Sequence, residues 1–106
     1  MPSRPTVAAC AALVLFTAAP VLASEKLSAQ GGCATCHAGA KKGIGPSWHD
    51  IAAKYKGQAD APALLARRVR EGSKGVWGPL PMAPTPAAKI GDADLNMLIA
   101  WVLKTP

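Results

Sequence analysis

The segment Cys33-Ala34-Thr35-Cys36-His37 (CATCH) places two cysteines three positions apart, with a histidine directly after the second. On one helical turn, thiols at this spacing reach the two vinyl groups of a haem, and the adjacent imidazole reaches the iron. The motif therefore predicts one covalent haem, held through Cys33 and Cys36 with His37 as an iron ligand. Small domains usually need a cofactor, a metal or disulfides for stability, so we expect the fold to be built around this haem.

Three other chemistries use similar residues. A redox disulfide of the thioredoxin type needs a βαβ context, and no run of alternating β-branched residues predicts a sheet here. A zinc site built from the motif and His49 would place the adjacent Cys36 and His37 on one ion, which is poor tetrahedral geometry. A structural disulfide between Cys33 and Cys36 closes almost no loop and adds little stability. The haem interpretation is favoured over these three.

The N-terminal 23 residues have the pattern of a secretory signal peptide. Arg4 supplies a positive charge, residues 7–19 are apolar, and Val21-Leu22-Ala23 offers small residues before a cleavage site. Cleavage directly after this tripeptide would divide the chain into a signal, residues 1–23, and one mature domain, residues 24–106. The alternative is a membrane anchor, but an apolar run of about 17 residues is near the lower limit for spanning a bilayer.

Cys10 is expected to leave with the signal. A lipoprotein cleavage site closes the apolar segment, whereas most of that segment follows Cys10. The mature chain then keeps two cysteines, both in the haem motif. Bacteria attach c-type haem outside the cytoplasm, so signal and motif agree. We expect a periplasmic protein without stable membrane insertion after cleavage.

The mature chain is small and basic. Removing 23 of the 106 residues leaves 83, with 11 basic and 6 acidic residues and a net charge of +5. Nucleic acid is not an expected partner of a secreted haem protein. Six lysines are candidates to surround the haem edge and steer an acidic redox partner, with an ordinary solvated surface as the equal alternative: Lys41, Lys42, Lys54, Lys56, Lys74 and Lys89.

The clearest predicted helix follows Gly91. Asp92 is placed to cap its first turn, and five apolar residues recur at helical spacing: Leu95, Leu98, Ile99, Val102 and Leu103. Three further helices are predicted over residues 62–71, 25–31 and 50–55. In the first of these, Gly72 acts as the stop, and three arginines lie mostly toward solvent: Arg67, Arg68 and Arg70.

Two loops join these helices, residues 38–46 and 72–91. Prolines in the second exclude regular structure: Pro79, Pro81, Pro84 and Pro86. A structureless loop of about 20 residues is unusual in a compact domain and indicates function. Met82 lies among these prolines, where a restricted backbone would hold a thioether at a fixed place over the cofactor.

The candidates for the second iron ligand are Met82, Met97 and His49. Met97 is placed on the last helix beside Leu98, the pattern of a core methionine. His49 follows His37 by only 12 positions and is expected to be a surface or hydrogen-bonding residue. Met82 is favoured. Because His/Met ligation leaves no open iron position for oxygen or peroxide, it indicates an electron carrier rather than an enzyme.

These residues resemble the small bacterial cytochromes of the c-551 type, within class I cytochrome c. The resemblance covers residues 25–106 and rests on Gly72–Met82 (GSKGVWGPLPM), Ile44-Gly45-Pro46 and Trp101-Val102-Leu103. It implies an all-α class I fold, with about four short helices around one haem c, and Met82 as the distal iron ligand.

The resemblance implies three further roles. The Pro46 carbonyl would accept the ring N–H of His37, the Trp77 indole N–H would point to a haem propionate, and Gly32 would let the first helix cross the last one near Trp101. Two positions depart from the pattern: Thr85 stands where the family often has Asn, and Ser28 where an aromatic residue is common.

The expected function is monomeric, single-electron shuttling by Fe(II)/Fe(III) cycling between respiratory redox proteins. The donor would be a bc1-type complex, and the acceptor a terminal oxidase, a nitrite reductase or a photosynthetic reaction centre. Two alternatives stay open. One is a haem sensor or peroxidase-like enzyme in which Met82 is displaceable, and the other is a fixed subunit of a larger respiratory or sulfur-oxidising complex.

Overall fold

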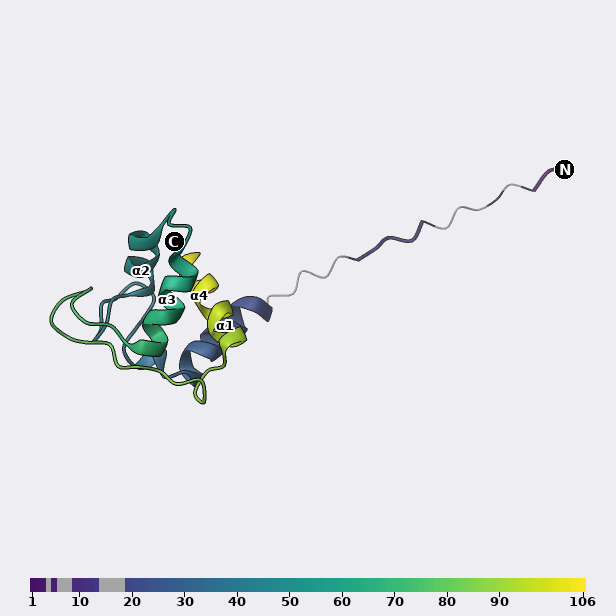
Figure 1. The fold of residues 1–106 in the computed structure, drawn as a ribbon. Helices are drawn as coiled ribbons and strands as arrows, with labels where there is room; N and C mark the ends of the chain where they lie inside the picture. Colours follow the sequence, from purple (N-terminus) through teal and green to yellow (C-terminus); the bar gives the residue numbers. More distant parts are fainter. Residues whose placement is uncertain (4, 6–8, 14–18) are drawn as a thin grey trace.

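The computed structural model describes residues 1–3, 5, 9–13 and 19–106. Within these ranges the protein is built from helices and loops (Figure 1), and an isolated bridge between Ser73 and Met82 is the β-type pairing they contain. The elements are α1 (Ala19–Gln30), the short 3-10 helix η1 (Cys33–Thr35), α2 (Trp48–Tyr55), α3 (Ala61–Glu71) and α4 (Asp92–Leu103). The expected all-α architecture with four short helices is confirmed.

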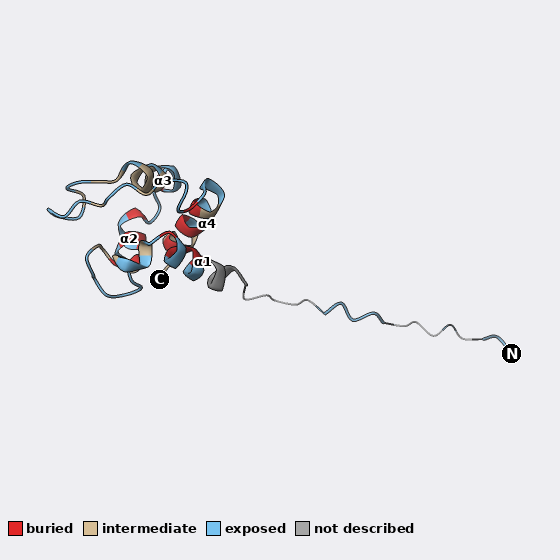
Figure 2. Ribbon diagram, turned by 90° about the horizontal axis from the view of Figure 1, so that it is seen from below, coloured by how far each residue is buried: buried red, intermediate tan, exposed pale blue. Residues whose placement is uncertain are grey.

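The described residues before Ala19 lie away from the helices and are exposed (Figures 1 and 2). Much of the predicted signal peptide, residues 4, 6–8 and 14–18, lies outside the described residues. Helix α1 begins at Ala19, earlier than the predicted residue 25, because Pro20 is tolerated in a first turn and the residues after it are good helix formers. Within the described part of the chain, each helix is too short or too polar to cross a membrane.

Helix α4 is the centre of the core and packs against α1, α2 and α3. Figure 2 shows buried segments on α1, α2 and α4, whereas α3 is drawn mostly as intermediate and exposed. The predicted apolar face of α4 is buried as expected, with Leu95 only 2% exposed, and it meets residues of α1, α2 and the segment before α4: Leu27, Ile51, Tyr55 and Ile90. The tightest packing therefore surrounds α4.

Two expectations about α4 are wrong. Met97 is 53% exposed rather than in the core, because it follows Leu95 by two positions and a turn of about 100° per residue directs it away from the buried face. Asp92 does not cap the helix. Gly91 occupies the cap position without a side-chain hydrogen bond, and the Asp92 carboxylate accepts from Arg70 instead.

Helix α3 ends at Gly72 as predicted, with a φ of 78° there. A Cβ at this position would stand 2.6 Å from the Met82 carbonyl oxygen, so the close approach of two chain segments also requires glycine. Arg67 is exposed as expected, but Arg70 is not free in solvent. It bonds to residues before and at the start of α4, because the end of α3 packs against them.

The turn between α1 and the haem motif uses its two glycines differently from the prediction. Gly32 is exposed, a Cβ there would meet nothing within 4 Å, and its φ of 76° is what favours glycine. The close contact belongs to Gly31, where a Cβ would lie 3.3 Å from the Leu27 oxygen and 3.6 Å from the Ile90 Cβ. The expected packing role of Gly32 near Trp101 is therefore wrong.

Candidate haem site

A cavity of about 760 Å³ opens between the haem motif, α2, α3, α4 and the loop of residues 72–91, hereafter the Met82 loop. Its volume lies in the range of cavities that enclose a cofactor-sized ligand. Apolar side chains from three helices line it, including Ile51, Leu65, Val69, Leu98 and Ile99. Such walls suit the flat, apolar body of a porphyrin.

The CATCH segment turns so that its chemistry-bearing residues share one cavity. The backbone N–H groups of Cys36 and His37 both donate to the Cys33 carbonyl, at 3.1 and 2.9 Å. All three side chains line the cavity and are half-buried. Burial raises the pKa of the Cys33 thiol above its ordinary value, and the neighbouring Cys36 adds to the rise against a backbone hydrogen bond that lowers it. The two thiols and the imidazole are thus presented together.

The His37 imidazole is held on three sides. Its Nδ1 lies 2.7 Å from the Pro46 carbonyl oxygen, so Nδ1–H donates and Nε2 keeps its lone pair. The ring stacks on Trp48 with centroids 4.9 Å apart and planes 25° from parallel. On another side a Cβ at Gly45 would stand 2.7 Å from His37 Cε1, so only glycine fits there. This fixed ring suits an iron ligand.

Of the three sequence candidates for the second ligand, Met82 alone lines the cavity. Its backbone is fixed by a two-hydrogen-bond bridge to Ser73, with N···O distances of 3.0 and 2.8 Å, and its side chain is half-buried. His49 and Met97 lie elsewhere, Met97 on the exposed side of α4. The cavity therefore brings one imidazole and one thioether together with two thiols.

Trp77 also lines the cavity and is 39% exposed. The ammonium group of Lys54 lies 5.2 Å from its ring centroid, a cation–π distance. This contact was not evident from the sequence, since the two residues are 23 positions apart. The expected bond from the Trp77 indole to a haem propionate stays a prediction.

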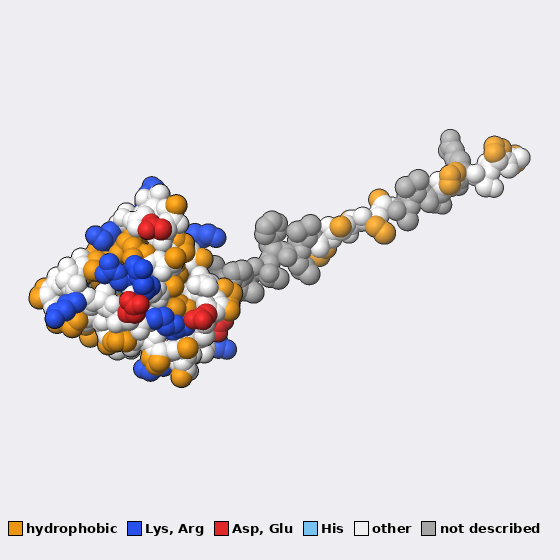
Figure 3. Space-filling model, viewed as in Figure 1, with side chains coloured by type: hydrophobic (Ala, Val, Ile, Leu, Met, Phe, Trp, Pro, Cys, Tyr) orange, Lys and Arg blue, Asp and Glu red, His pale blue; other side chains and the backbone are white. Residues whose placement is uncertain are grey.

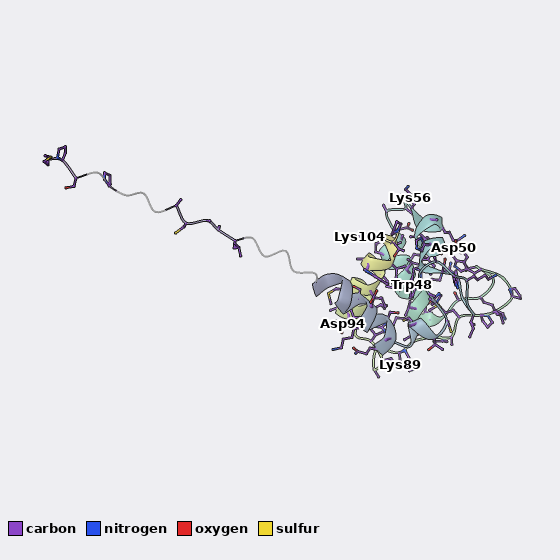
Figure 4. All side chains as sticks on the ribbon, turned by 180° about the vertical axis from the view of Figure 1, so that it is seen from behind. Trp48, Asp50, Lys56, Lys89, Asp94 and Lys104 are labelled. Atoms are coloured by element: carbon purple, nitrogen blue, oxygen red, sulfur yellow. The ribbon has the colours of Figure 1, made fainter. Side chains whose placement is uncertain are left out.

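The basic residues do not form one ring around the cavity. Among the six candidate lysines, Lys42 and Lys89 line it, together with Arg68, which sequence reasoning had assigned to solvent. Figure 4 places Lys56 and Lys89 at opposite ends of the helical body. Figure 3 shows Lys and Arg side chains gathered on the face that carries α3, with apolar side chains between them.

The donor set favours haem over zinc. Within the described residues, no group of three or more His, Cys, Asp or Glu side chains is arranged to hold a metal ion. His49, the fourth ligand that a zinc site would need, does not line the cavity. A ligand attached through two thiols and enclosed by apolar walls agrees with the residues present.

Residues 21–106 match the family model described as Cytochrome c. The chain belongs to the cytochrome c family. It is 60% identical over 81 residues to cytochrome c2 of Rubrivivax gelatinosus, covering 76% of this chain and 95% of that protein. It is 47% identical over 79 residues to cytochrome c-551 of Pseudomonas aeruginosa, covering 74% of this chain and 73% of that protein.

Solved structures of cytochromes agree with the fold. Wild-type cytochrome c552 of Nitrosomonas europaea superposes with a TM-score of 0.70 at 40% identity, covering 77% of this chain and 99% of that one. The class 1 cytochrome MtoD of Sideroxydans lithotrophicus gives 0.68 at 31% identity, covering 80% and 95%. As a class I cytochrome c, the chain carries a covalent haem c and serves as an electron carrier.

Proposed function

We propose that this cytochrome, as mature residues 24–106, carries single electrons through the periplasm on one haem whose iron is ligated by His37 and Met82. The observation that supports this most directly is the shared cavity. His37, Met82 and the two motif cysteines line it, whereas His49 and Met97 do not. The family model begins at residue 21, which agrees with a domain that starts near the proposed cleavage site.

The haem supplies the redox chemistry by cycling between ferrous and ferric iron. The residues of this chain hold it. Cys33 and Cys36 attach it, the Pro46 carbonyl orients His37, and the bridge to Ser73 fixes the backbone of Met82. A neutral thioether favours ferrous iron and so raises the reduction potential. The apolar walls would shield the iron from water, and His37 and Met82 would stay bound while an electron is gained or lost.

The rim of the cavity supports a role in transient docking. Ile44 and Leu80 both line the cavity and are more than half exposed, so they lie at its mouth. Lys42 and Lys89 line the same cavity and add positive charge to it. An apolar contact flanked by lysines suits brief, salt-sensitive encounters with acidic redox proteins. We propose a bc1-type complex as donor and a terminal oxidase or nitrite reductase as acceptor.

With His37 and Met82 both bound to the iron, no position would be left for a substrate, so we propose a carrier rather than an enzyme. The sensor or peroxidase-like alternative requires Met82 to leave the iron readily. The alternative of a fixed subunit requires a stable complex, so purification of the native protein as a free monomer counts against it. Each alternative therefore has its own observable.

Optical spectra of the purified holoprotein test the proposal. We expect the wild-type protein to give a low-spin c-type spectrum with the weak near-infrared band of Met–iron ligation, and to bind no carbon monoxide when reduced. Met82→Ala should lose the band and bind carbon monoxide, while Met97→Ala should match the wild type. Carbon monoxide binding by the wild-type protein would refute the carrier proposal and favour the sensor or enzyme.

A further inference from the structure

Arg70 makes three hydrogen bonds to a part of the chain that is distant in sequence. Its guanidinium donates to the Thr85 carbonyl at 3.3 Å, to the Ile90 carbonyl at 2.8 Å and to the Asp92 carboxylate at 2.8 Å. The side chain is 22% exposed, so it is largely enclosed by these partners. One residue of α3 thereby binds the second half of the Met82 loop and the start of α4.

Few other contacts fix this loop. Met82 and Ser73 are joined by the two-bond bridge, and the Thr85 N–H donates to the Val69 carbonyl at 2.8 Å. Between these points and α4, the backbone bonds given by the structure include one local turn, from the Lys89 N–H to the Pro86 carbonyl. Figure 1 shows the loop reaching outward from the helices before it returns to α4. Beside the Thr85–Val69 bond and the packing of Ile90 in the core, the three bonds of Arg70 therefore add to the few that close this loop on α3.

The three bonds of Arg70 differ in their surroundings. Ile90 is 1% exposed, so its carbonyl has no water to replace a lost donor, and breaking that bond carries the cost of a buried unsatisfied acceptor. The Asp92 side chain is 87% exposed, and an ion pair to such a group contributes little. The bonds to the Thr85 and Ile90 carbonyls should therefore contribute most of the stabilisation that Arg70 gives to the closed loop.

We propose that Arg70 is a positioning residue that keeps the Met82 loop closed on α3, and thereby keeps Met82 from leaving the iron. The inference rests on the proposed ligation by Met82. Arg70 touches neither the cavity nor the methionine, since it does not line the cavity and its bonds go to residues 85, 90 and 92. It acts by lowering the population of a loop-open state.

Imidazole binding to the ferric holoprotein reports that population, because added imidazole reaches the iron only when Met82 has left. The apparent affinity scales with the fraction of open protein. Arg70→Gln should raise the imidazole affinity about tenfold, as expected for loss of charged hydrogen bonds to partly buried acceptors. Arg67→Gln removes a charge from the same helix at an exposed position and should leave the affinity within about twofold of wild type.

Amide hydrogen exchange of the reduced holoprotein gives a second readout that does not depend on the iron. In Arg70→Gln, the Thr85 and Met82 amides should exchange about tenfold faster, while core amides of α4 such as Ile99 keep their wild-type rates. Asp92→Asn keeps an oxygen acceptor and both carbonyl bonds, so its exchange and imidazole affinity should stay near wild type. If Arg70→Gln yields too little holoprotein, Arg70→Lys carries the test, because an ammonium cannot span the same acceptors.

The outcomes separate the two proposals. The role of Arg70 would be overturned if both Arg70 variants kept the wild-type imidazole affinity and the wild-type exchange rate at Thr85. It would also be overturned if exchange rose equally throughout α4, because that indicates a global loss of stability. Met82→Ala serves as the reference for an open iron. If it binds imidazole no more tightly than wild type, ligation by Met82 is wrong, whatever the Arg70 variants do to loop exchange.

Discussion

The Pro46 carbonyl oxygen lies 2.7 Å from His37 Nδ1, on a loop that passes so close to the imidazole that Gly45 has no room for a side chain. The same loop thus supplies the hydrogen-bond acceptor and the steric wall. Trp48, the first residue of α2, stacks on the ring. The orientation of the histidine is therefore set by backbone positions and by one aromatic ring, before any iron is bound.

We expect Gly45→Ala to displace the His37 ring or the loop. A Cβ there would stand 2.7 Å from Cε1 and 3.0 Å from Nδ1, so one of the two must move. Overpacking of this kind costs about 1–3 kcal/mol. Guanidinium unfolding of the holoprotein should show a loss of that size in the free energy of unfolding. Gly39→Ala is the control, because a Cβ there meets nothing within 4 Å. Equal stability of the two variants would refute the steric argument.

We expect Leu95→Ala and Met97→Ala to differ sharply although the residues are two positions apart on α4. Leu95 is 2% exposed and belongs to the central cluster, so truncation should cost about 2–5 kcal/mol. Met97 is 53% exposed, and its truncation should change stability by less than about 0.5 kcal/mol. Thermal or guanidinium unfolding compares them directly. A large loss for Met97→Ala would show that its exposure is covered by a partner or by another copy of the chain.

The α4 helix illustrates how far sequence reasoning reaches. Its start after Gly91 and its buried face were predicted correctly, because capping and apolar periodicity are local properties. Met97 was misassigned because adjacency to Leu98 was given more weight than its own angle around the helix. Arg70 was placed in solvent because its acceptors lie 15 to 22 residues further along the chain, and no local pattern predicts such bonds.

In the haem site, too, local motifs were predicted from the sequence and long-range contacts were not. CATCH and the proline-flanked Met82 are short motifs whose thiols, imidazole and thioether can be recognised from the sequence alone. The structure brings both motifs to one cavity. The contact of Lys54 with Trp77 and the place of Arg68 in the wall depend on how α2, α3 and the Met82 loop meet. The packing role expected of Gly32 belongs to Gly31, because a close contact and a positive φ both favour glycine and the sequence does not distinguish them.

We expect the exported holoprotein to begin at Ser24. Intact mass and N-terminal sequencing of the periplasmic fraction should show a chain of 83 residues plus one haem, since 23 of the 106 residues are removed. Ala23→Phe should retain the precursor, because signal peptidase reads small residues at this position. Ala29→Phe, an exposed position later in α1, controls for general effects on the helix. Recovery of the uncleaved chain in the membrane fraction of wild-type cells would favour the anchor over the signal.

We expect the charge at the cavity rim to control the rate of electron transfer to an anionic oxidant. Lys42 and Lys89 line the cavity, whereas Lys56 does not and lies at the opposite end of the helical body from Lys89 (Figure 4). Stopped-flow oxidation of the reduced protein by hexacyanoferrate(III) at low ionic strength should slow about tenfold in Lys42→Glu/Lys89→Glu, because electrostatic steering changes association rates by factors of about 10 to 1000. Lys56→Glu carries half the charge change at a residue outside the cavity lining, and salt at 0.1 M screens exposed charges beyond about 10 Å, so its effect per charge should be smaller there. Salt should reduce the difference between the double variant and the wild type. If Lys56→Glu slows the reaction as much per charge as the double variant at 0.1 M salt, net charge governs the encounter, and the rim is not the place where electrons leave.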